Sequence, residues 1–81
     1  MNLRDTVAGM VSDDYKERFK AEYQQVMIRK EKLQTMIGEW INGDLSFDPV
    51  CQAEILVDQL AVMEKYLTIL ELRARTEGIE L

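Results

Sequence analysis

The chain has 81 residues, no histidine, a single cysteine and a formal net charge of -5 from ten basic and fifteen acidic side chains. One cysteine cannot form a disulfide within the chain, and the lack of histidine removes the commonest metal ligand and the commonest general base, so neither a metal site nor an enzyme is expected. The negative charge also opposes general binding to nucleic acid polymers or to an anionic membrane surface.

A chain of this length forms one small domain, residues 1–81, that buries only about 60 % of the surface exposed by its unfolded form. With no disulfide or metal to support it, such a domain is expected to self-associate. The first residues contain neither a basic segment nor a long apolar run, so a signal peptide and a membrane span are not indicated. A lone thiol also fits a reducing compartment, and we expect a soluble cytoplasmic protein without a cofactor.

Residues 1–12 contain a short amphipathic segment that predicts one or two helical turns. A long helix is expected to follow over residues 13–42, because no proline interrupts it. Asp13 and Asp14 are suitable N-caps, and Gly43 is a suitable C-terminal stop. The N-terminal half of the chain is therefore predicted to be a short helix followed by a long one.

Residues 43–48 are the only predicted loop. A second long helix is expected over residues 49–76, with Asp48 as its cap and Pro49 at its first position, where proline is well tolerated. Cys51 would then lie in the first turn, where a reactive thiol and an ordinary small residue are both possible, and we favour the second.

The second long helix carries two adjacent apolar stripes. The first stripe is Leu56, Leu60, Met63, Leu67, Leu70 and Ala74, and the second stripe is Ile55, Val62, Tyr66 and Ile69. One stripe is enough to pack against the first long helix in an antiparallel hairpin. The second then has no partner inside the chain, and such a surface usually marks an interface. The predicted fold is all-α, a short N-terminal helix followed by a long antiparallel helical hairpin, in an oligomer.

Lys30 interrupts an apolar heptad pattern on the first long helix. The pattern consists of Phe19, Tyr23, Val26, Lys30, Leu33, Ile37 and Trp40. An ammonium in such a seam must reach water along its aliphatic stem, meet a carboxylate, or meet a ligand from outside. Trp40, at the end of the pattern, is expected to pack against Phe47 and the start of the second long helix.

Positive charge gathers between residues 15 and 37, where six cations and three anions give a local charge of +3. Tyr15, Phe19 and Tyr23 lie among these cations, and an aromatic ring beside a cation is what nucleotide binding requires. The same spacing of four also builds a core face, and on charge alone we favour an ordinary solvated helix.

Three segments carry a family resemblance: DDYKERFKAEY from Asp13, the F-x-P-x-C turn from Phe47, and the ending E-x-R-A-x-x-E-G-I-x-L from Glu71. From Leu3 to Leu81 the chain resembles the anti-CBASS and anti-Thoeris hairpin-domain family of small phage proteins, which includes a crAss-like phage gene product. The resemblance implies a homohexamer that binds cyclic di- or trinucleotide immune messengers in the host cytoplasm and holds them without cutting them. It thus implies a molecular sponge used by a phage for immune evasion.

The resemblance also implies site residues. In the family's cyclic dinucleotide pocket, a tyrosine at the start of the first long helix and a lysine fifteen residues later contact the ligand, and Tyr15 and Lys30 have this separation. Because fifteen residues span roughly 22 Å of helix, the two are expected to meet across a two-fold axis between two copies. Lys16 and Arg18 are further candidates for the phosphate charge. Arg73 is the candidate for the arginine of the family's cyclic trinucleotide site, and partnership with the helix dipole is its alternative role.

Two questions stay open at this point. This chain has D-Y-K where better-studied members have a start of the G-Y-R type, so the preferred ligand is undefined. A second class of function is a helical adaptor, which would oligomerise and dock a protein partner through the second stripe.

Overall fold

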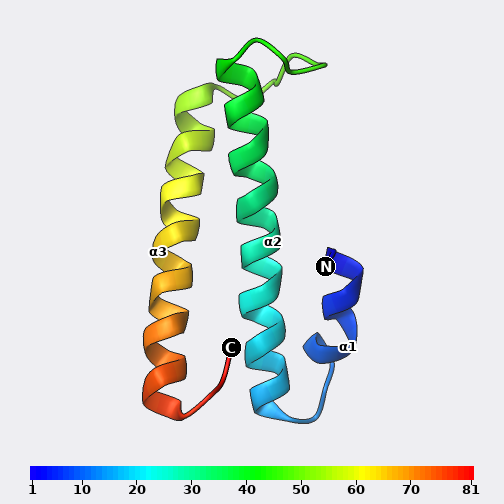
Figure 1. Cartoon of the computed structure of the whole chain (residues 1–81), viewed down its shortest axis with the longest axis vertical. Coiled ribbons are helices and arrows are strands. Elements are labelled where there is room, and N and C mark those ends of the chain that lie inside the picture. The colour runs from blue at the N-terminus through cyan, green and yellow to red at the C-terminus, as the bar shows by residue number, and fades with distance from the viewer.

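The computed structural model describes residues 1–81, and all of its regular elements are helical. A 3₁₀ turn, η1 (Leu3–Thr6), runs directly into the one-turn helix α1 (Val7–Met10), and two long helices follow, α2 (Tyr15–Ile41) and α3 (Ala53–Glu77). The all-helical prediction is confirmed. The long helices lie side by side and run in opposite directions, while the N-terminal segment covers the side of α2 that faces away from α3 (Figure 1). The molecule is elongated, with extents of 43 × 24 × 17 Å.

Helix α2 begins and ends where its capping residues predict. The Asp14 side chain accepts a hydrogen bond from the backbone N–H of Lys16 at 3.0 Å, which satisfies one of the free donors at the helix start. At the other end Asn42 caps the helix, and Gly43 adopts the left-handed conformation with a φ of 76°. These local signals confirm the predicted limits of the first long helix to within two residues.

The predicted start of the second long helix is wrong. Helix α3 begins at Ala53, and Gln52, which precedes it, makes no side-chain capping hydrogen bond. Asp48 and Pro49 lie in the connection instead, and exposed Cys51 lies in a bend. The fixed φ of proline suits an extended connection as well as a first helical position, and no capping bond of Asp48 selects the helical alternative.

The hydrophobic core cluster lies where α2 begins and α3 ends. Phe19, Leu70, Ala74 and Ile79 form a buried cluster there. Gly78 adopts a φ of 70° that ends α3, and the backbone N–H of Ile79 donates to the carbonyl of Ala74 at 2.8 Å. This Schellman-type ending turns the chain back so that the Ile79 side chain packs onto the core.

The N-terminal segment packs closely on α2 because two small residues meet there. A Cβ atom added at Gly9 would lie 3.0 Å from the Cβ of Ala21. The buried Thr6 hydroxyl satisfies its hydrogen bonding within the segment by donating to the Leu3 carbonyl at 2.7 Å. Gly9 is therefore required for close approach, although it weakens the helix that contains it.

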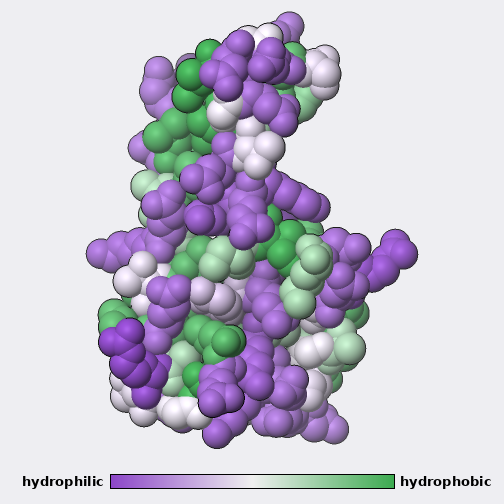
Figure 2. Space-filling model, in the orientation of Figure 1, coloured by the Kyte–Doolittle hydropathy of each residue, from purple (hydrophilic) through white to green (hydrophobic).

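The two apolar stripes of α3 differ in exposure, as the sequence predicts. Every residue of the first stripe is buried or half-buried. The second stripe is exposed, with Val62 at 67 % and Ile55 at 54 %. Figure 2 shows apolar surface gathered over the upper part of the two long helices, near the connection, and further apolar patches among polar side chains below. The molecule as a single chain leaves an apolar face of α3 uncovered.

No helix combines the length and the apolar composition that crossing a bilayer requires.

Candidate functional site

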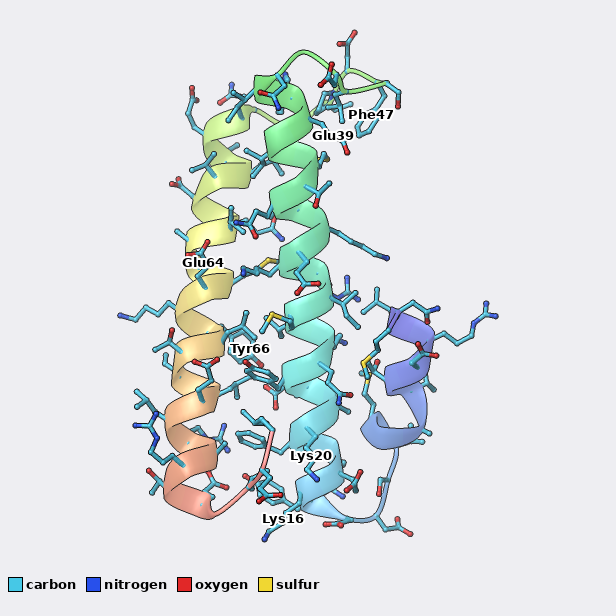
Figure 3. The ribbon with its side chains drawn as sticks, viewed as in Figure 1. Lys16, Lys20, Glu39, Phe47, Glu64 and Tyr66 are labelled. Carbon is cyan, nitrogen blue, oxygen red and sulfur yellow. The ribbon has the colours of Figure 1, made fainter.

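All three tyrosines of the chain donate a hydrogen bond to a glutamate on the opposite long helix. The pairs are Tyr15 with Glu77 at 2.6 Å, Tyr23 with Glu71 at 2.6 Å, and Tyr66 with Glu22. In Figure 3 the ring of Tyr66 points from α3 toward α2. These phenol–carboxylate hydrogen bonds join the two helices along their lower half, where the hydrophobic core cluster lies.

One of these pairs also includes an arginine. Arg73 donates from Nη2 to the hydroxyl of Tyr15 at 3.0 Å and from Nε to the Oε2 atom of Glu77 at 3.2 Å. Its guanidinium carbon lies 5.0 Å from the centre of the Phe19 ring, within range of a cation–π interaction. The Tyr15 ring meets Phe19 edge to face, with ring centres 6.2 Å apart. We call Tyr15, Arg73 and Glu77 the terminal cluster.

Each member of the terminal cluster shifts the titration of the others. The hydrogen bond to Glu77 raises the pKa of Tyr15, and the same bond lowers the pKa of Glu77. The Glu77 hydrogen bond likewise raises the pKa of Arg73. At neutral pH the cluster therefore contains a neutral phenol, a carboxylate and a guanidinium.

The guanidinium of Arg73 retains binding capacity. Arginine has five N–H donors, and two of them are used inside the cluster, so three have no protein partner. The side chain is also 47 % exposed. An anion arriving from solvent can thus reach Arg73 beside the exposed ring of Tyr15.

Lys30 is half-buried on the side of α2 that faces α3. It lines a shallow groove of about 280 Å³ together with Met27, Gln34, Glu64, Leu67, Thr68 and Glu71. No carboxylate oxygen lies within 4.0 Å of its ammonium, since the two salt bridges of the molecule involve other residues. Lys30 therefore forms no direct ion pair within the chain. Its ammonium can still reach water or meet a ligand from outside.

The structure brings Tyr15 together with Arg73, and it does not bring Tyr15 together with Lys30. Tyr15 and Lys30 lie on one straight helix, α2, at positions separated by roughly 22 Å. Lys16 is exposed at the same end of the molecule as the terminal cluster (Figure 3). Arg18 instead uses Nη1 to donate to the carbonyl of Ser12 at 2.8 Å, and so holds the turn that precedes α2.

The glutamates of this site were not among the residues selected from the sequence. The sequence feature that could have pointed to Glu71 and Glu77 is the motif that begins at Glu71, because most of its fixed positions have a role in the structure. Glu71 and Glu77 accept from tyrosines, Ala74 and Ile79 are buried, and Gly78 ends the helix. The motif thus contains the residues through which the end of α3 packs against, and hydrogen-bonds to, the start of α2.

The connection end of the molecule has a different character. Trp40 is half-buried and shares an apolar groove of about 340 Å³ with Ala53 and Val57 of α3, which agrees with its expected packing on the start of that helix. The expected contact with Phe47 is not found, since the one aromatic pair of the chain is Tyr15 with Phe19, and Phe47 is 54 % exposed in the connection. The longer connection moves Phe47 away from the start of α3.

The fold and the site define a small all-helical protein whose candidate site consists of polar groups suited to holding a ligand. The chain belongs to the Sequestin family, whose match covers residues 13–76, from the turn before α2 almost to the end of α3. Comparisons with curated proteins and with solved structures found no significant match.

Proposed function

We propose that this protein binds cyclic oligonucleotide immune messengers, namely cyclic di- or trinucleotides, and sequesters them without cleaving them. In this proposal it is a phage anti-defence protein of the anti-CBASS and anti-Thoeris type that acts in the cytoplasm of the host cell. The Sequestin family match supports it, because the family name is consistent with sequestering a ligand. The matched residues include Tyr15, Lys30 and Arg73.

The observation that carries the proposal is the terminal cluster. It presents an exposed aromatic ring beside a guanidinium that has three free donors. A ring of this kind stacks on a nucleobase, and a guanidinium binds phosphate oxygens in a fixed, often bidentate geometry. Lys16 at the same end adds a second positive charge for the phosphates.

Lys30 supports a ligand site formed by more than one copy. The Lys30 residue is half-buried and its ammonium has no carboxylate within 4.0 Å, so its charge stays available to an anion from outside. In a pair of copies related by a two-fold axis, Tyr15 of one copy would approach Lys30 of the other. The exposed second stripe of α3 and a core of only eight buried apolar residues favour such an assembly, and we propose a hexamer.

The groups present support the proposal of binding without cleavage. The chain has no histidine, and the carboxylate of the cluster is engaged by both Tyr15 and Arg73. Its lowered pKa also makes Glu77 a weak base. The cluster is thus equipped to hold a phosphodiester rather than to activate water against it.

A thermal-shift screen tests the proposal. A ligand that binds only the folded state stabilises it by about 2.7 kcal/mol at a concentration of 100 times the Kd. For a domain of this size that corresponds to a rise in Tm of roughly 10 °C or more. The panel should contain cyclic dinucleotides, cyclic trinucleotides and glycocyclic ADP-ribose. A Tm unchanged by every member of the panel would contradict the proposal.

The exposed second stripe favours one alternative, an oligomeric adaptor that docks a protein partner. The variant Lys30→Leu separates the two functions. Replacing a half-buried, unpaired cation by an apolar residue should raise the Tm under both hypotheses. Only the sponge hypothesis also predicts weaker binding of cyclic nucleotides. Lys65→Leu is the matched control, because it removes the same charge from an exposed position on α3.

A further inference from the structure

We propose that Glu77 is an internal anion that closes the Arg73 site, and that a phosphate group of the ligand binds by taking the place of its carboxylate. This inference rests on the proposed function in that the ligand is a nucleotide with phosphodiester groups. Glu77 would thus control access to the Arg73 guanidinium, and its carboxylate would weaken the binding of a phosphate group there.

The carboxylate of Glu77 occupies the positions that phosphate oxygens would take. Oε1 accepts from the Tyr15 hydroxyl at 2.6 Å, and Oε2 accepts from Nε of Arg73 at 3.2 Å. A phosphodiester likewise offers two non-bridging oxygens that share one negative charge, which suits the same pair of donors. The Tyr15 hydroxyl also accepts from Arg73 at 3.0 Å, so the two donors stay linked when the acceptor is exchanged.

The backbone of Glu77 is fixed, but its carboxylate can rotate away from Arg73. It is the last residue of α3, and the left-handed Gly78 and the buried Ile79 fix the chain directly after it. Its side chain is 33 % exposed, so the carboxylate can turn into water. A surface ion pair of this kind contributes little to stability, and therefore a ligand phosphate can compete with it.

The chain contains a matched pair that lacks the arginine. Tyr23 donates to Glu71 at 2.6 Å, the same bond length as in the terminal cluster, but no hydrogen bond or salt bridge joins an arginine to this pair. The substitutions Glu77→Gln and Glu71→Gln each remove one negative charge and one phenol–carboxylate bond. Only the first of them frees a guanidinium.

The experiment titrates inorganic pyrophosphate into the wild type, Glu77→Gln and Glu71→Gln at low ionic strength. The NMR signal of the Arg73 Nε–H group reports binding at this position, and circular dichroism confirms that each variant is folded. Glu77→Gln should lower the Kd at Arg73 roughly two- to fivefold relative to Glu71→Gln, the factor expected when a competing surface ion pair is removed. Calorimetry, which does not need the Arg73 signal, should show that the gain in pyrophosphate affinity disappears in the double variant Glu77→Gln with Arg73→Gln.

An equal Kd at Arg73 in Glu77→Gln and Glu71→Gln would overturn the inference, because both variants change the net charge by the same amount. The result is independent of the thermal-shift screen. If cyclic nucleotides bind but the two variants respond equally, only the role of Glu77 fails. If Glu77→Gln gains pyrophosphate affinity but no cyclic nucleotide binds, only the proposed function fails.

Discussion

Replacing Tyr23 by phenylalanine tests the phenol–carboxylate bonds that join α2 to α3. The change removes the hydrogen bond to Glu71 but keeps the ring that packs against the core cluster. The Glu71 hydrogen bond, with smaller contributions from burial and from the charge of Glu71, raises the pKa of Tyr23 from 10.0 to about 12. Because the pKa in the folded state lies above that in the unfolded state, this bond stabilises the protein fully below pH 10 and stops doing so as the pH rises through about 12.

The rise in the pKa sets the size of the effect. A change from 10.0 to about 12 corresponds to at most about 2.7 kcal/mol of stability. Tyr23 is only half-buried, so screening by solvent reduces the expected value to about 1 kcal/mol, in the range measured for single hydrogen bonds.

Urea unfolding of the wild type and Tyr23→Phe between about pH 8 and pH 12 measures this contribution. The wild type should be more stable by about 1 kcal/mol at pH 8, and the difference should shrink above pH 10 and vanish near pH 12. Other titrating groups act on both proteins and cancel in the difference. A difference that stays constant over this range, or an absorbance titration that gives Tyr23 an ordinary pKa, would refute the reasoning.

Four further substitutions test the core, two glycines of the long helices and the exposed stripe. Leu70→Ala, at a residue that is 1 % exposed, should lower the free energy of unfolding by about 3 kcal/mol, and a loss below about 1 kcal/mol in urea unfolding would contradict the described core. Gly78→Ala should destabilise by about 1 kcal/mol because its φ is 70°, whereas Gly38→Ala, in open space within α2, should stabilise by a similar amount. Val62→Glu should leave the helical content unchanged but lower the oligomer size in sedimentation velocity, and an unchanged size would argue against an interface at the second stripe.

The features predictable from the sequence are those whose signals are local. Asp14 and Gly43 limit α2 through contacts and backbone angles within a few residues. The two stripes of α3 follow from helical periodicity alone, which is why their different exposure could be predicted. The start of α3 at Ala53 could not, because Pro49 is compatible with both a helix start and an extended connection.

The terminal cluster depends on contacts between distant parts of the chain. Tyr15 and Arg73 are both recognisable as candidates, but their hydrogen bond joins residues 58 positions apart, and that of Tyr15 with Glu77 joins residues 62 positions apart. No spacing rule within one helix predicts such a pairing. It appears only once the two long helices pack side by side, which places the last turn of α3 beside the first turn of α2.

Sequestration without cleavage is tested by calorimetric titration with the cyclic nucleotide that gives the largest thermal shift, followed by chromatography of the ligand released on denaturing the protein. A sequestering protein should give a saturable heat of binding and release the intact cyclic nucleotide. Linear or hydrolysed nucleotide in the released fraction would contradict binding without cleavage, and the absence of any binding heat would contradict the ligand class itself.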